Sequence, residues 1–378
     1  MKKFLCFIIS ICLLIAMNGC RWTDQNPSDS SNNSNDNSSS SSSDSNNENT
    51  QKAMYAISVP TTTDKTTAED GTVVFQYTHP HISLTLEDQK VADKIILDFL
   101  RRVDSTKETA DSVAQMALAS NKVSKLQTPY LYHLTYSPAR IDNTVLSLFG
   151  NNVVFSGGGH PERTCVSASY DLRTGDVLTL ASIMSVSAKT DDFCKLVLEG
   201  LADMAEGDYL YENYTQTVKQ RFTADATQDE AWYFTQSGLC FYFVPYEIAP
   251  YSSGVVTVEI PFEKLGNLLH RAYLPVKENA TTGEITVTSF EKINLECYFN
   301  IAELIADKEG AMYMVSTGGT VQDVRIMLTD YVGTHTVFAT NILSQGCGIM
   351  VQANQDQLKT MKISYISDGK TNTIPLMG

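Results

Sequence analysis

Residues 1–52 differ in composition from the rest of the chain, and we expect the folded part to begin after residue 52. Residues 21–52 consist mostly of Ser, Asn and Asp and contain no apolar cluster. A segment of this composition cannot bury enough apolar surface to offset the entropy that ordering removes. We therefore expect residues 21–52 to form a disordered tether with an end-to-end distance of roughly 30 Å. About 325 residues remain after the tether, which is enough for two domains.

The first 20 residues have the order of a secretory signal. Two lysines precede an apolar run at residues 4–17, and Asn18, Gly19 and Cys20 come directly after it. The run is shorter than the about 20 apolar residues that a membrane-spanning helix needs, so it predicts a signal peptide at residues 1–20. Its end resembles the lipobox of bacterial lipoproteins, whose cysteine becomes the lipid-modified first residue. The resemblance implies lipidation of Cys20 and an extracytoplasmic protein anchored to the cell membrane by lipid.

The residues after the tether are acidic. Of the 28 basic and 43 acidic residues in the chain, four and five lie before residue 53, which leaves 24 and 38 and a formal net charge of −14. This charge argues against nucleic acid and anionic membrane surfaces as direct partners, and it would steer a cationic partner toward the protein. The plain alternative is that the charge only keeps the protein soluble.

The cysteines do not form an obvious disulfide framework. Two of the eight lie in the signal and a third is Cys20, which leaves an odd number and no C-x-x-C pair. An exported protein with structural disulfides normally has an even set. We predict mostly buried free thiols, with one disulfide as the open alternative, at Cys165, Cys194, Cys240, Cys297 and Cys347.

Residues 53–272 alternate between strand and helix patterns. Apolar residues at every fourth position, from Val91 to Val103, predict a helix that Asp88 caps. Thr190 is expected to cap a second long helix, and a weaker one is predicted at residues 108–120. Period-two alternation predicts strands at residues 73–77, 81–86, 130–136, 145–149, 153–155, 167–172, 176–180, 238–243 and 256–260. Turns are expected at residues 150–152 and 173–175, and a short helix at residues 262–269.

Residues 276–378 contain short β-like runs that turn signals separate. The runs lie at residues 284–288, 311–316, 321–328, 336–339 and 362–366, while periodicity does not decide residues 300–307. The whole pattern predicts an α+β fold, with an antiparallel sheet and packed helices followed by a small β-sandwich-like C-terminal domain.

Two passages resemble a known family. Residues 157–160 read GGGH and residues 170–180 read YDLRTGDVLTL, while residues 243–262 read FVPYEIAPYSSGVVTVEIPF. Residues 54–270 are thus similar to an uncharacterised extracytoplasmic bacterial domain, which occurs in lysozyme-sensing anti-sigma factors and beside the catalytic domain of some peptidoglycan deacetylases. The resemblance implies helices packed against a sheet and, in the anti-sigma members, lysozyme binding. We expect neither a deacetylase catalytic domain nor a cytoplasmic segment before the apolar run, so the sigma-factor and deacetylase activities of the family are not expected here.

Few residues suggest chemistry. His79 and His81 can share a strand face as metal ligands, although strand histidines are more often polar edge residues. His160 comes after three glycines, where the ordinary interpretation is a tight turn. No nucleophile elbow, P-loop or dinucleotide fingerprint occurs, and Glu247 and Glu259 have no evident second carboxylate for glycoside hydrolysis. One aromatic cluster belongs either to the core or to a recognition surface. Its residues are Phe241, Tyr242, Phe243, Tyr246 and Tyr251.

The sequence therefore predicts a non-enzymatic surface lipoprotein whose family domain binds a cell-envelope ligand. A cationic hydrolase of the lysozyme type is the sharpest version of this hypothesis. The alternatives are an envelope enzyme or enzyme accessory that acts on peptidoglycan, and a structural module for surface assembly. We predict no catalytic residue, metal or cofactor, and the sequence does not identify the residues that bind the ligand.

Overall fold

The computed structural model describes residues 54–206, 209–223, 231–276, 280–330 and 333–377. The predicted signal, the lipidation site at Cys20 and the tether lie outside the described residues. Residues 51–378 form one compact unit. No helix among the described residues is long and apolar enough to cross a membrane. The fold is α+β with a β-rich C-terminal region, as the sequence predicts.

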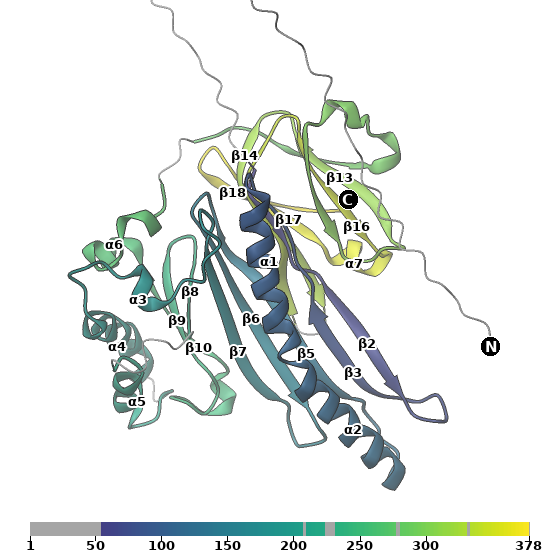
Figure 1. Ribbon diagram of the computed structural model, residues 1–378, viewed down its shortest axis with the longest axis vertical. Coiled ribbons are helices and arrows are strands. Elements are labelled where there is room, and N and C mark those ends of the chain that lie inside the picture. Colours follow the sequence, from purple (N-terminus) through teal and green to yellow (C-terminus); the bar gives the residue numbers. More distant parts are fainter. Residues whose placement is uncertain (1–53, 207–208, 224–230, 277–279, 331–332, 378) are drawn as a thin grey trace, which may run out of the picture. The chain divides into compact units, whose positions relative to one another are not determined.

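A five-stranded sheet forms the centre of the N-terminal region (Figure 1). Its order is β2-β3-β5-β6-β7, and β3 runs parallel to β5 while the other neighbours are antiparallel. The sheet is therefore mixed and not wholly antiparallel. Its strands are β2 (Thr61–Thr67), β3 (Val73–Pro80), β5 (Tyr130–Ile141), β6 (Val145–Phe155) and β7 (Glu162–Asp171).

Two helices, α1 (Gln89–Asp104) and α2 (Lys107–Val123), pack against one face of this sheet. The carboxylate of Asp88 accepts the backbone N–H of Lys90 at 2.9 Å and so caps α1. The predicted stripe from Val91 to Val103 is buried. The structure thus confirms the helix that the cap at Asp88 and the spacing of apolar residues predict.

A smaller sheet covers part of the opposite face, in the order β10-β9-β8. Ser147 of β6 accepts the backbone N–H of Phe234 at 2.9 Å, and the Phe149 ring stacks on Tyr233 at 4.5 Å. All six residues of β9 are buried because helices cover the other side of this sheet. Its elements are α3 (Leu180–Ile183), α4 (Thr190–Glu206), α5 (Tyr214–Arg221), β8 (Trp232–Phe234), β9 (Gly238–Phe243), β10 (Val256–Pro261) and α6 (Phe262–Leu265).

Two sheets share one hydrophobic core in the C-terminal region. One has the order β18-β17-β14-β15-β1-β4 and the other β11-β13-β16-β12. The stretch that periodicity left undecided is a strand, β12, which runs parallel to β16. The elements are β11 (Ile285–Ser289), β12 (Asn300–Ile305), β13 (Ala311–Thr317), β14 (Thr320–Asp330), β15 (Gly333–Ser344), β16 (Cys347–Ala353), α7 (Gln355–Thr360), β17 (Lys362–Ser367) and β18 (Lys370–Pro375).

The six-stranded sheet also contains strands from the start of the chain. β1 (Ala56–Ser58) pairs with both β15 and β4 (Ser83–Thr85). The guanidinium of Arg325 in β14 donates hydrogen bonds to the carbonyls of Pro138 at 2.8 Å and Ala139 at 3.1 Å in β5. The division into domains at residues 53–272 and 276–378 stays a prediction. The pairing of β1 with β15 joins backbone from the two sides of the expected boundary.

One predicted turn and one predicted strand are wrong. Residues 150–152 lie inside β6, which runs without interruption from Val145 to Phe155. A Cβ atom on Gly150 would lie 2.2 Å from the Thr135 carbonyl oxygen, so this glycine permits close packing within the sheet and not a turn. The turn predicted at residues 173–175 is present, but the strand predicted at residues 176–180 is reduced to one bridge between Tyr170 and Val177, and Leu180 already begins α3.

Candidate functional site

Two loops from different sheets meet at a cluster of exposed and half-buried rings, which we call the aromatic site (His160, Tyr246 and Tyr251). Residues 156–161 join β6 to β7, and residues 244–255 join β9 to β10. The His160 ring stacks on Tyr251 at 4.1 Å, and its Nε2 lies 3.4 Å from the Tyr246 hydroxyl. Tyr251 donates a hydrogen bond to the Pro161 carbonyl at 2.8 Å. The structure therefore joins residues from both passages that carry the family resemblance.

Tyr246 has an unusual backbone conformation. Its φ is 71°, a region that a bulky side chain rarely adopts. Its N–H donates to the Ala249 carbonyl at 2.9 Å, and its side chain is 58% exposed. Strain of this kind costs of order 1–3 kcal/mol and is typical of functional sites. The loop thus presents a large aromatic ring to solvent at an energetic cost to the fold.

An ion pair holds the second loop beneath this ring. Arg221 of α5 pairs with Glu247 and donates a hydrogen bond to the Tyr242 carbonyl at 2.7 Å. The other carboxylate oxygen of Glu247 accepts the Val244 N–H at 3.0 Å. The guanidinium also lies 4.7 Å from the centre of the Phe243 ring. Glu247 therefore shapes the loop between β9 and β10 through both of its carboxylate oxygens.

Gly157 shapes the first loop. Its φ is 90°, and a Cβ atom there would lie 2.3 Å from the Tyr130 hydroxyl. We expect Gly157→Ala to lower the free energy of unfolding by about 1–3 kcal/mol, because the substitution adds both backbone strain and a clash. Denaturant unfolding measures this loss. Gly159→Ala is the matched control, since a Cβ at that position meets nothing within 4 Å. Equal effects of the two variants would contradict this role of Gly157.

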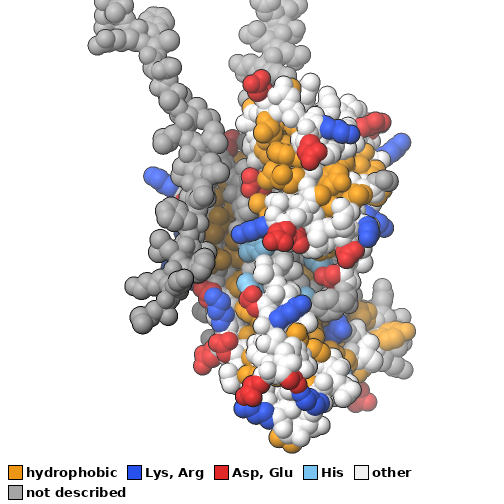
Figure 2. All heavy atoms as spheres, turned by 90° about the vertical axis from the view of Figure 1, so that its right-hand side faces the viewer, with side chains coloured by type: hydrophobic (Ala, Val, Ile, Leu, Met, Phe, Trp, Pro, Cys, Tyr) orange, Lys and Arg blue, Asp and Glu red, His pale blue; other side chains and the backbone are white. Residues whose placement is uncertain are grey.

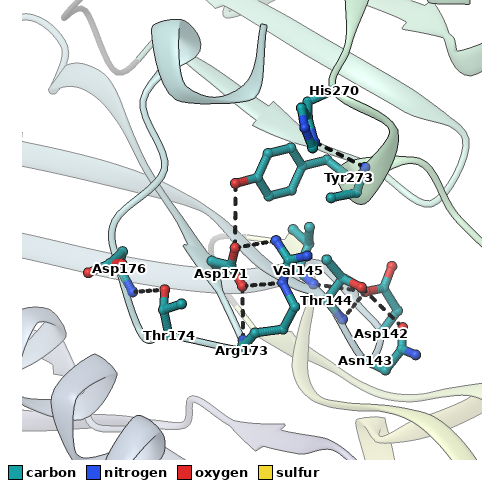
Figure 3. A network of polar contacts seen from close by, with 11 residues as sticks. Asp142, Asn143, Thr144, Val145, Asp171, Arg173, Thr174, Asp176, His270 and Tyr273 are labelled. Atoms are coloured by element: carbon teal, nitrogen blue, oxygen red, sulfur yellow. Dashed lines mark hydrogen bonds and ion pairs between the residues drawn. The ribbon is translucent and has the colours of Figure 1, made fainter. Parts of the chain in front are cut away.

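The first passage of the resemblance also builds a turn (Figure 3). The Asp171 carboxylate accepts the N–H and the Nε–H of Arg173, each at 2.9 Å, and the Tyr273 hydroxyl at 3.4 Å. Burial raises the pKa of Asp171, but the hydrogen bonds from Arg173 outweigh it, and the net pKa is lowered. Gly175 has a φ of 72° and lies against α1. Residues 171–175 thus hold the C-terminal end of β7 against α1 and Tyr273.

The two strand histidines have separate partners. His79 lies 3.2 Å from the Asp64 carboxylate and stacks on Tyr77. His81 donates to the Ile305 carbonyl at 3.4 Å. In the part of the chain that the structure describes, no group of three or more His, Cys, Asp or Glu side chains is placed to hold a metal ion. Among the described residues, His79 and His81 therefore have no third side chain placed to complete a metal site.

The other candidates divide between core and surface. Phe241, Tyr242 and Phe243 are buried and belong to the core, whereas Tyr246 is exposed. Glu259 accepts a hydrogen bond from Thr235 at 2.6 Å on the outer face of β10. All five cysteines in the described residues are free thiols, of which Cys194, Cys240 and Cys347 are buried.

The net negative charge is not gathered on the face that Figure 2 shows, where acidic and basic side chains alternate. Hydrophobic side chains gather in the upper part of that face. Exposed large hydrophobic residues of the C-terminal region include Leu295, Phe299 and Met312. Any steering of a cationic partner would therefore come from the net charge of the protein, and not from a single acidic patch on this face.

Comparison with known proteins identifies one region. Residues 190–263 match a family model described as "Protein of unknown function (DUF3298)". The DUF3298 region runs from α4 to α6 and contains Arg221, Tyr246, Glu247 and Tyr251, whereas His160 lies outside it. The aromatic site is thus completed by a loop that precedes the matched region. A comparison with curated proteins found no match.

Two similar solved structures are also described as DUF3298 proteins. One, from Bacteroides fragilis NCTC 9343, is 17% identical, with a TM-score of 0.42, and the match covers 58% of this chain and 94% of that one. The other, from Pseudomonas aeruginosa PAO1, is 17% identical, with a TM-score of 0.37, and the match covers 58% of this chain and 97% of that one.

Proposed function

We propose that this protein is a non-catalytic binding module, which a lipid on Cys20 holds at the outer surface of a bacterial membrane and which captures its partner through the aromatic site. The observation that carries the proposal is the exposed Tyr246 ring, which a strained and braced loop presents beside His160 and Tyr251. Tyrosine supplies large contact area at low entropic cost and is enriched in binding hot spots.

The partner that we propose is a cationic cell-envelope protein of the lysozyme type. The formal net charge of −14 after residue 52 supports this choice, since it favours encounter with a cation. The resemblance to the lysozyme-sensing family points to the same chemistry. Recognition would then combine long-range attraction with aromatic contacts at the two loops.

Replacing Tyr246 tests the site. We expect Tyr246→Ala to weaken lysozyme binding at physiological salt by at least tenfold, since truncating a hot-spot residue costs about 2 kcal/mol or more. Titration calorimetry with the full chain measures the affinity. Tyr209→Ala is the matched control, because that tyrosine is 61% exposed but lies outside the aromatic site.

Two results would overturn different parts of the proposal. If the unaltered chain does not bind lysozyme at micromolar concentrations, the lysozyme version is wrong. If it binds but the Tyr246 and Tyr209 variants bind equally well, the partner stands and the aromatic site is not where it binds.

A further inference from the structure

A second candidate site lies at the edge of the central sheet, and none of the aromatic-site residues lines it. It is a cleft of about 330 Å³ between the end of α1, the helix-facing side of β5 and β6, and the edge strand β7, which Tyr242 of β9 also borders. This volume is at the lower end of the range of roughly 300–1,000 Å³ that small-molecule sites occupy. The lining residues are Arg102, Ser105, Thr106, Leu134, Tyr136, Asn152, Cys165, Val166, Ser167 and Tyr242.

The floor of the cleft depends on a glycine. Gly150 of β6 lies opposite Tyr136 on one neighbouring strand and Val166 on the other. A Cβ atom on Gly150 would lie 3.1 Å from the Tyr136 ring and 3.0 Å from a Val166 methyl group. Because position 150 has no side chain, an aromatic ring and an aliphatic group can approach each other there. They provide an apolar floor beneath the polar rim.

The charge in the cleft is balanced. Arg102 is the one side chain with a formal charge among the described residues that line it, and its Nε–H donates to the Asp98 carboxylate at 2.8 Å. Burial raises the pKa of the Cys165 thiol to about 12, so this group is neutral at physiological pH. The other polar groups are hydroxyls and an amide. A neutral ligand suits this lining better than an anion, since Asp98 already neutralises the guanidinium.

One polar group of the lining lacks a hydrogen-bond partner. The Asn152 amide donates from Nδ2 to the Tyr132 hydroxyl at 3.1 Å, whereas its Oδ1 is buried and unpaired. If the amide is turned over, the nitrogen becomes the unpaired atom, so one of the two lacks a partner in either orientation. A buried polar atom without a partner is destabilising, and a ligand hydroxyl or amide can supply the missing hydrogen bond.

We propose that this cleft binds a neutral, polyhydroxylated ligand of about the size of one sugar ring. The ligand would lie over Tyr136 and Val166 and exchange hydrogen bonds with the Asn152 amide and the surrounding hydroxyls. This site is distinct from the aromatic site, and the inference does not depend on the proposed function.

Titration of the full chain by ligand-observed NMR tests the inference, with glucose and N-acetylglucosamine as neutral probes and glucose 6-phosphate as the charged comparator. We expect a neutral probe to bind with a dissociation constant of about 1 mM and the phosphate to bind at least tenfold more weakly. Ser105→Phe should fill the mouth of the cleft and weaken binding at least tenfold. Ser124→Phe is the matched control, because Ser124 is the exposed C-cap of α2 and does not line the cleft.

Each other outcome would overturn the inference. If neither glucose nor N-acetylglucosamine binds at about 10 mM, ten times the expected dissociation constant, the cleft does not take this class of ligand. Preference for the phosphate would replace the neutral chemistry with anion binding. Equal binding by the Ser105 and Ser124 variants would place the sugar elsewhere on the protein.

Discussion

Replacing Arg140 with alanine is expected to lower the free energy of unfolding by about 3–5 kcal/mol, the loss typical of breaking a buried ion pair. The Arg140 side chain is fully buried, pairs with Asp142 at 2.6 Å and donates to the Tyr273 carbonyl at 2.8 Å. Its guanidinium also lies 5.1 Å from the centre of the Phe234 ring and 5.3 Å from that of Phe262. One residue of β5 therefore ties the central sheet to β8, α6 and the segment after α6.

Denaturant unfolding of three variants separates the causes of this loss. Arg140→Met keeps most of the side-chain volume without the charge, so it should lose less than Arg140→Ala if packing dominates. Asp142 also accepts the backbone N–H groups of Thr144 and Val145, and it holds the β5–β6 turn in either variant (Figure 3). Arg163→Ala, at an exposed position of β7, should stay within about 0.5 kcal/mol. A loss below about 1 kcal/mol for Arg140→Ala would contradict this account.

Acid should destabilise the protein through His133. The side chain is 2% exposed on the face of β5 that packs on the C-terminal sheet. Burial lowers its pKa to about 4, the nearby Asp330 opposes this change, and His335 adds to it. The unfolded chain takes up this proton near pH 6.5 and the folded chain only near pH 4. Stability should therefore fall as the pH drops from about 6.5 to 4, by up to about 3 kcal/mol, and this contribution should level off below about pH 4.

Unfolding free energies of the native protein and of His133→Gln, measured from about pH 7 to about pH 4, test this linkage. The variant removes the titrating group, so its curve should be flatter over that range. Ser137→Ala is the control, because it lies on the same face of β5 by strand alternation and does not titrate. Parallel curves for the native protein and the glutamine variant would show that His133 does not cause the acid sensitivity.

His133 also shows what limits prediction from the sequence. The alternation of Tyr132, Leu134 and Tyr136 correctly predicts a strand with one buried face. Local periodicity cannot show that β15, some 200 residues later, covers the second face and buries His133 and Thr135 as well. Helix α1 was predictable because its cap and its apolar stripe are local signals. The pairing of β1 with β15 was not, since three residues carry too little pattern.

The aromatic site was predictable only in parts. The sequence singles out His160 as a turn residue and Tyr246 and Tyr251 as members of an aromatic cluster. Nothing in their spacing indicates that the two loops meet, because the contact depends on how the small sheet packs on β6 and β7. Position 246 also carries no glycine to signal its positive φ, so the strain is visible only in the structure.

Hydrogen exchange of the full chain, with and without saturating lysozyme, tests the central claim most directly. The account predicts that bound lysozyme slows exchange at residues 156–161 and 244–255, the two loops of the aromatic site. Exchange in the C-terminal region should stay unchanged. If these loops exchange at the same rate in the complex while another surface becomes protected, the protein captures its partner elsewhere and the account is wrong.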